Sequence, residues 1–293
     1  MRADKPSLTA ALVAGVRALY ASFPSGLQAA PDPEALHLVP LILQLPAEFV
    51  KRVPLTASVL HHSVGAASLG LSWHVALRTL AIDEAAVSAA ERGLRQVVLL
   101  GAGLDNRVGR LSSLQNMAAF EVDHPTMQRE KKRRLANSTS APHRHFVPVN
   151  FEVDKLDEAL QKSGFDKDLP TFWIWEGVTP YLTRPAIEST LEVVGRHSAK
   201  TSQIALTYMR PPADLGRTVA RLATAVAASI GEPVHAVFHR EEMAQLLAGF
   251  GFCVHTDESD IDFAKRYWNP LPGATPPGFQ MYPEWERLVI AEM

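Results

Sequence analysis

Cysteine and long apolar runs are both scarce in this chain of 293 residues. Its one cysteine, Cys253, excludes an internal disulfide and a metal site built from several cysteines, and it is typical of a reducing compartment. Pro40 and Pro46 divide the longest apolar candidate, so no run approaches the ~18 residues that suggest a membrane span. Asp4 and Pro6 interrupt the N-terminal stretch that faintly resembles a signal peptide. We therefore expect a cytoplasmic protein with no membrane association.

Several functional classes find no support. A formal net charge of −2 gives no electrostatic case for binding nucleic acid, and we expect the basic run at residues 129–134 to be the exposed face of a helix. His61 and His62, like His143 and His145, lack further ligands at a workable spacing, so no metal site is predicted. The G-x-S-x-G motif of many serine hydrolases is absent.

The most informative feature is the segment QVVLLGAGLDNR at residues 96–107. Its apolar first part is typical of a strand buried on both faces of a parallel sheet, and it ends in Gly101 and Gly103, which allow a tight turn and close approach of a ligand. About twenty residues later, a second apolar run ends in Asp123, placed to accept hydrogen bonds from the two hydroxyls of a ribose. The pattern predicts a nucleoside-containing cofactor.

A missing glycine favours one cofactor over another. Dinucleotide-binding loops have a third glycine where this chain has Asn106, and Asp105 in the same loop would repel a diphosphate. A phosphate-free cation such as S-adenosylmethionine fits the loop better. A nicotinamide cofactor stays open as the alternative, and so does a tight turn without a ligand.

Hydrophobic periodicity divides the chain into two parts. We expect helices at residues 8–21 and over 34–92, the last of them opened by Asp83 and Glu84 and ended by an αL cap at Gly93. Strands are predicted at residues 97–100, 118–123, 145–150, 171–176, 203–208, 252–256 and 287–292, with a helix at 241–247. The predicted organisation is a helical cap and lead-in at 1–93, followed by a core at 94–293 with a helical insertion at about 211–238.

Five blocks in order resemble the leucine carboxyl methyltransferase family in its bacterial form, which includes polyketide O-methyltransferases. They are the N-terminal helices (LTAA at 8–11, VRAL at 16–19 and DPEA at 32–35), LRTLAID at 77–83, the loop at 96–107, EVDHP at 121–125 and EGVTPYLT at 176–183. The resemblance implies an α/β fold, a Rossmann-like class I methyltransferase with a seven-stranded, mostly parallel sheet. It also implies helices on both sheet faces and an N-terminal helical cap.

The resemblance also implies roles in binding S-adenosyl-L-methionine, with S-adenosyl-L-homocysteine as product. Arg78 would bind the methionine carboxylate, and Glu176 would accept from the ammonium or line the methyl-transfer site. The loop formed by Gly101, Ala102 and Gly103 would pass against the methionine and ribose, and Asp123 would hold the ribose.

The adenine end departs from the family pattern. Asn150 and Phe151 stand where the family usually has aspartate and leucine. Asparagine keeps an acceptor oxygen but loses the charge, so we expect a weaker hydrogen bond to the adenine amino group. The backbone N–H of Phe151 remains a donor, and its ring could lie against the adenine.

The expected reaction is methyl transfer to a carboxylate or hydroxyl oxygen of a small, apolar molecule. Tyr181 is the candidate for orienting the acceptor, whereas His124 is more simply read as a helix-start residue. The acceptor pocket is expected to involve residues 215–230 and 269–278, and Trp268 and Trp285 either line it or pack. A protein C-terminal carboxyl methyltransferase and a non-catalytic or nicotinamide-binding module stay open, and the oligomeric state is not predicted.

Overall fold

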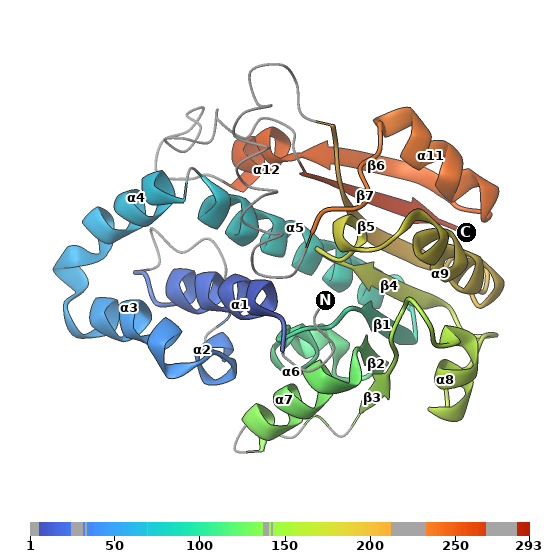
Figure 1. Cartoon of the computed structure of the whole chain (residues 1–293), viewed down its shortest axis with the longest axis horizontal. Coiled ribbons are helices and arrows are strands. Elements are labelled where there is room, and N and C mark those ends of the chain that lie inside the picture. The colour runs from blue at the N-terminus through green and yellow to red at the C-terminus, as the bar shows by residue number, and fades with distance from the viewer. Residues whose placement is uncertain are drawn as a thin grey trace.

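The computed structural model describes residues 6–24, 32, 34–68, 70–136, 141, 143–211, 233–267 and 286–293. A seven-stranded sheet runs through the middle of the molecule, with helices on both of its faces (Figure 1). Its strands are β1 (Gln96–Leu100), β2 (Ala118–Asp123), β3 (Arg144–Pro148), β4 (Thr171–Trp175), β5 (Gln203–Met209), β6 (Cys253–Ser259) and β7 (Glu286–Glu292).

The strand order is β3-β2-β1-β4-β5-β7-β6. All neighbours pair in parallel except β7, which lies antiparallel to both β5 and β6. The predicted mostly parallel sheet of seven strands is therefore confirmed, with β2 at the predicted bounds and the other strands shifted by one to three residues at one or both ends. The order changes direction between β1 and β4, the position at which open α/β sheets form a ligand crevice.

The described α-helices are α1 (Leu8–Ala21), α2 (Ala35–Leu38), α3 (Leu41–Arg52), α4 (Ala57–Ala67), α5 (Leu71–Glu91), α6 (Arg107–Arg110), α7 (Pro125–Leu135), α8 (Leu156–Lys162), α9 (Arg184–Arg196), α11 (Arg240–Gly249) and α12 (Asp260–Tyr267). Short 3₁₀ turns are η1 (Pro54–Thr56), η2 (Ser112–Leu114) and η3 (Thr179–Tyr181). No helix in these described ranges is both long and apolar enough to cross a bilayer.

Helix α5 is longer than predicted. It begins at Leu71, after Gly70 with φ 91°, and not at Asp83. Asp83 is buried inside the helix and accepts a hydrogen bond from Arg107 Nε at 3.1 Å, so its carboxylate serves an ion pair and not a helix start. The predicted αL residue at Gly93 is confirmed, with φ 88°.

Alternate residues of the central strands enter two different cores, as the pleat of a doubly covered sheet requires. Val97 and Leu99 pack with α1, α5 and α12 on one face. Val98 and Leu100 pack with α8, α9 and α11 on the other. Because helices before residue 93 share the first core with the sheet, the hydrophobic interior is continuous across the predicted boundary between cap and core.

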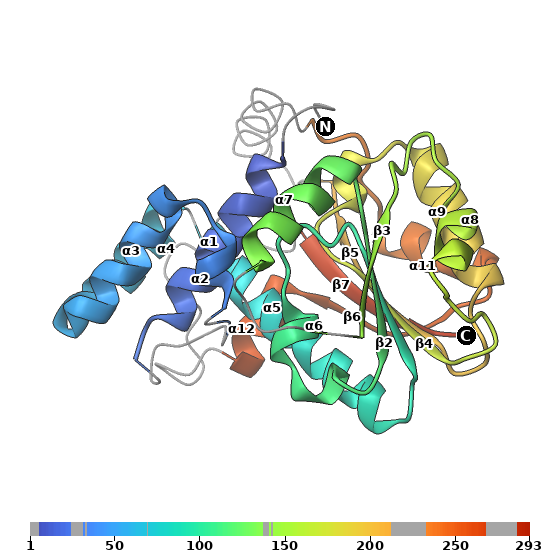
Figure 2. The ribbon, with the colours of Figure 1, turned by 90° about the horizontal axis from the view of Figure 1, so that it is seen from below.

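Helices α1 to α4 extend the molecule beyond the sheet at one end (Figure 2). The N-terminus of α1 is capped by Ser7, whose hydroxyl accepts from the backbone N–H of Ala10 at 3.0 Å. This helix has the predicted bounds, and it lies next to the carboxyl edge of the sheet, where the pocket described below opens.

Candidate functional site

A pocket of about 400 Å³ lies where β1, β2 and β4 end. All nine predicted site residues line it: Arg78, Gly101, Ala102, Gly103, Asp123, Asn150, Phe151, Glu176 and Tyr181. Helix α1 supplies a further wall with Ala10, Val13 and Arg17. The volume of the pocket lies in the range of small-molecule binding sites. The fold thus gathers at one sheet edge residues that are far apart in the sequence, such as Arg17 and Glu176, which are 159 positions apart.

The glycine loop needs glycine for two separate reasons. Gly101 has φ 72°, and a Cβ at this position would meet Val178 Cγ2 at 2.3 Å. Gly103 has φ 48°, and a Cβ there would lie 3.4 Å from Ala10 of α1. The loop therefore combines left-handed backbone with close packing on both sides, which brings its main chain to the pocket surface.

Asp123 ties the glycine loop to the end of β2. One carboxylate oxygen accepts from Gly103 N at 2.5 Å and the other accepts from His124 N at 2.6 Å. Burial raises the pKa of Asp123 to about 6, although these two backbone hydrogen bonds oppose the shift. Additional donors such as sugar hydroxyls would favour the ionised form.

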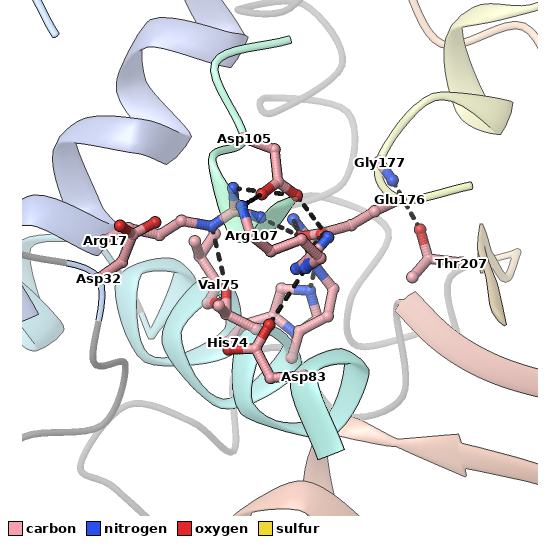
Figure 3. Close-up of polar contacts among 12 residues, drawn as sticks. Arg17, Asp32, His74, Val75, Asp83, Asp105, Arg107, Glu176, Gly177 and Thr207 are labelled. Atoms are coloured by element: carbon pink, nitrogen blue, oxygen red, sulfur yellow. Dashed lines mark hydrogen bonds and ion pairs between the residues drawn. The ribbon is translucent and has the colours of Figure 1, made fainter. Parts of the chain in front are cut away.

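Three arginines converge on Glu176 at the end of β4. Its carboxylate accepts from Arg17 Nη2 at 2.7 Å, from Arg78 Nε at 3.0 Å and from Arg107 Nη2 at 3.0 Å. Figure 3 shows Arg17 and Arg107 approaching Glu176 from separate segments, with Asp105 beside them. Burial alone would raise the pKa of Glu176, but the three guanidinium groups outweigh it and hold the pKa well below its usual range.

Arg78 connects this cluster to a second buried group. Its Nη1 donates to Glu286 at 2.6 Å, and Glu286 also contacts His74 Nε2 at 2.5 Å. His74 Nδ1 lies 2.9 Å from Asp260. Burial opposes protonation of His74, but Asp260 and Glu286 outweigh it and raise its pKa to about 9. Arg78 is therefore a buried, doubly paired residue.

Asp105 does not present the free negative charge that the sequence argument assumed. It accepts from the backbone N–H of Arg107 at 2.8 Å and is ion-paired with the Arg107 side chain, while Arg17 Nη1 lies 3.6 Å away. Burial would raise the pKa of Asp105, but the charges of Arg107 and Arg17 outweigh burial, so the pKa is lowered overall. Because these cations compensate the charge, electrostatic repulsion of a diphosphate is not a valid reason to exclude one.

The residues at the adenine end form a turn. The Asn150 side-chain oxygen accepts from Glu152 N at 3.1 Å, and Asn150 N donates to Asp154 at 2.8 Å. Phe151 lines the pocket, with its ring centroid 6.4 Å from that of Trp175. Asn150 thus keeps one lone pair of its carbonyl oxygen for a ligand.

Tyr181, which follows β4, and His124, which follows β2, both line the pocket. Tyr181 ends the turn η3 and is half-buried in the pocket wall. His124 also lines the pocket, but its Nδ1 accepts from Thr126 N at 3.3 Å at the start of α7. The interpretation of His124 as a helix-start residue is confirmed. In the basic run of α7, Arg129, Lys132 and Arg133 are exposed as expected, but Arg134 is half-buried and Lys131 is buried and paired with Glu121 at 2.8 Å.

Sequence reasoning missed the contribution of Arg17 and Arg107. Arg17 is a charged residue on the otherwise apolar, buried side of α1, beside Ala14 and Ala18, and that position was the available signal. Arg107 stands at the end of the glycine motif with a fully buried side chain. The expected acceptor-pocket segments 215–230 and 269–278, together with Trp268 and Trp285, lie outside the described residues.

No metal cluster of histidine, cysteine or carboxylate side chains occurs within the described part of the chain. His61 is instead buried against the aromatic rings of Tyr20, Phe23 and Trp73. Burial lowers its pKa to about 4, helped by His62.

Comparison with known proteins identifies a family. The sequence profile described as leucine carboxyl methyltransferase matches residues 10–195. A relative from Mycobacteroides abscessus, provisionally named an S-adenosyl-L-methionine-dependent methyltransferase, is 33% identical over 224 residues, which are 74% of this chain and 73% of the relative. A relative of the same provisional name from Parafrankia sp. is 39% identical over 49% of this chain and 46% of its own length. The alignments with the first relatives span about half of those relatives' length.

A solved structure shares the fold. The crystal structure of a provisionally named methyltransferase from Thermobifida fusca YX superposes with a TM-score of 0.60 at 16% identity, covering 99% of this chain and 95% of that one. At this identity the likeness establishes the architecture, including the helices that precede the sheet.

Proposed function

The chain belongs to the leucine carboxyl methyltransferase family, and from this premise we propose that it transfers the methyl group of S-adenosyl-L-methionine to an oxygen of a small, apolar acceptor. One observation carries the proposal. The glycine loop, Asp123 and the cluster around Glu176 line a single pocket at the switch point of the sheet.

The polar end of the pocket suits the methionine part of the cofactor. That part carries both a carboxylate and an ammonium, and the pocket presents both guanidinium and carboxylate groups there. Arg17 and Arg78 are the candidates for the carboxylate, and Glu176 is the candidate for the ammonium. Because these side chains pair with one another, the two charges of the ligand would join or replace existing ion pairs.

The other end suits a nucleoside. Asp123 is the candidate for the ribose hydroxyls. The main chain of the Gly101–Gly103 loop lines the pocket and could pass beside the sugar, because its glycines carry no side chain. Phe151 offers an aromatic ring and a backbone donor, and Asn150 offers a carbonyl oxygen, for the adenine.

The bound cofactor supplies an activated methyl electrophile. The chain's own residues then have to hold the acceptor oxygen in line with that methyl group and exclude water. Tyr181 is the candidate for orienting the acceptor through its hydroxyl, and Val13, Val178 and Leu182 give the pocket apolar walls. Such walls support an apolar small molecule as the acceptor, and a carboxylate acceptor would need no base because it is ionised at neutral pH.

The proposal is tested in two stages. Calorimetry should show binding of S-adenosylhomocysteine at one site per chain and no binding of NADH. The enzyme is then incubated with S-adenosylmethionine and with small phenols, aliphatic carboxylic acids or a peptide ending in a free leucine carboxylate. S-adenosylhomocysteine release is measured by mass spectrometry, and alkaline hydrolysis distinguishes a methyl ester from an ether.

We expect release with one of the small-molecule classes and none with the peptide. Turnover of the peptide alone would replace the proposal by a protein carboxyl methyltransferase. Binding of NADH without binding of S-adenosylhomocysteine would replace it by a nicotinamide-binding module.

A further inference from the structure

Seven large apolar side chains are exposed between the start of α3 and the first turn of α4, on α3, on its C-cap residue, on η1 and on α4. Their exposed fractions run from 40% for Val53 to 95% for Leu55. The set, called here the α3–α4 face, consists of Leu41, Ile42, Leu45, Phe49, Val53, Leu55 and Val59. These helices lie at one end of the molecule in both overall views (Figures 1 and 2).

Helix α3 is apolar on two opposite sides. Ala47 and Val50 are buried and pack toward the protein interior. Leu41, Leu45 and Phe49 recur at intervals of four and therefore form a separate stripe, which faces outward. A helix that only covered its own domain would need the first side and would carry polar residues on the second.

The exposed area is that of an interface. Aromatic side chains present roughly 150 to 250 Å² and aliphatic ones less, so the seven residues at their exposed fractions expose on the order of 600 Å² of apolar surface. Monomeric proteins seldom expose an apolar patch beyond ~300–600 Å². A stable protein–protein interface takes about 800 Å² from each partner, and the apolar side chains of one α3–α4 face supply most of that area.

The charged groups beside the face do not oppose self-association. Glu48 and Lys51 lie one turn apart, with Glu48 Oε1 3.7 Å from Lys51 Nζ, and Arg52 follows. Glu48, Lys51 and Arg52 all lie in the C-terminal half of α3, so when two copies of the helix pair antiparallel about a two-fold axis these charges lie opposite the uncharged N-terminal half and meet no like charge. The face carries no block of like charges that would oppose self-association or select an anionic membrane.

We propose that the α3–α4 face is the two-fold interface of a homodimer. The interface would also bear on the pocket, because α3 packs on α1: a Cβ at Gly15 of α1 would lie only 3.4 Å from Leu43 of α3. Helix α1 in turn supplies Ala10, Val13 and Arg17 to the pocket wall. Dimerisation would therefore hold that wall in place.

The test measures oligomeric state, so it is independent of the proposed enzymatic activity. The full chain is examined by sedimentation velocity from about 1 to 100 µM, as a mass-action equilibrium requires. The variants are Ile42→Glu, Leu55→Glu and the double substitution. Both residues are exposed in one copy, so the fold should be retained, which circular dichroism checks. Val153→Glu, at an equally exposed valine before α8, is the matched control.

We expect a dimer for the wild type and the control, at least a tenfold higher dissociation constant for each single variant, and a monomer for the double variant. A monomeric wild type at every concentration would overturn the proposal, as would double variants that stay dimeric. Flotation of a monomeric protein with phosphatidylcholine–phosphatidylglycerol vesicles, lost in the double variant, would assign the face to a membrane instead.

Discussion

Replacing Asp123 by asparagine is the most informative single change in the pocket. The substitution keeps the shape of the side chain and removes its charge. In the structure the two carboxylate oxygens accept from Gly103 N and His124 N at 2.5 and 2.6 Å, so their remaining lone pairs are available for ligand hydroxyls. Asparagine would place an NH₂ group against one of these backbone donors.

The size of the effect follows from hydrogen-bond energetics. A hydrogen bond to a charged acceptor contributes ~1.5–3 kcal/mol and one to a neutral acceptor ~0.5–1.5 kcal/mol. Losing the difference at two ribose hydroxyls costs about 2–3 kcal/mol, which raises the dissociation constant of S-adenosylhomocysteine by roughly 30- to 150-fold. Calorimetry at pH 7.5 measures this, with the exposed Asp168→Asn as control.

The same carboxylate predicts a pH dependence. Its pKa is raised to about 6, and ribose hydroxyls bind the ionised form, so affinity is close to its maximum about one pH unit above the pKa and declines as pH falls through 6. At pH 5 only about one tenth of Asp123 is ionised, which weakens binding about tenfold in the wild type and removes this dependence from Asp123→Asn. A folded Asp123→Asn protein that binds like the wild type would refute the role of this residue.

Three further substitutions test the packing and charge of the site. Glu176→Gln leaves three buried guanidinium groups without their shared carboxylate and should lower the free energy of unfolding by about 3–5 kcal/mol in urea titrations. The control Glu188→Gln breaks one exposed pair with an arginine and should change the free energy of unfolding by under about 1 kcal/mol. Gly101→Ala should destabilise the protein more than Gly93→Ala, because both glycines have positive φ but only the first would place a methyl 2.3 Å from a valine side chain, and equal losses in thermal unfolding would contradict this. The pKa of His74 is raised to about 9, so its stabilising charge is fully present below pH 6.5 and is lost as pH rises through 9. The free energy of unfolding should therefore fall by about 3 kcal/mol over this range in the wild type and not in His74→Gln. An identical pH slope in the variant would exclude the histidine as the source.

Local patterns predicted the sheet and the position of the pocket. The strand ending at Leu100, the glycine turn and Asp123 follow from residues within about thirty positions of one another, and the alternation of strands with helices limits the topology to few choices. The αL turn at Gly93 is equally local, because glycine after a helix has one common use.

The buried ion-pair network around Glu176 could not be predicted from local sequence patterns. Arg17 and Glu176 are separated by 159 positions, and their hydrogen bond arises only when α1 folds against the end of β4. The misplaced start of α5 has the same cause: Asp83 resembles a helix-opening residue in sequence but is an ion-pair partner in space. Asp105 is a further example: its negative charge is compensated by Arg107 and Arg17, and the sequence pattern alone does not show that these arginines lie beside it.

A crystal structure of the protein with S-adenosylhomocysteine is the most direct test of the account. It should show the ligand in the pocket at the ends of β1, β2 and β4, with its ribose hydroxyls donating to Asp123 and its amino-acid end beside Arg17, Arg78 and Glu176. Ligand bound at another surface, or a ribose that makes no contact with Asp123, would contradict it.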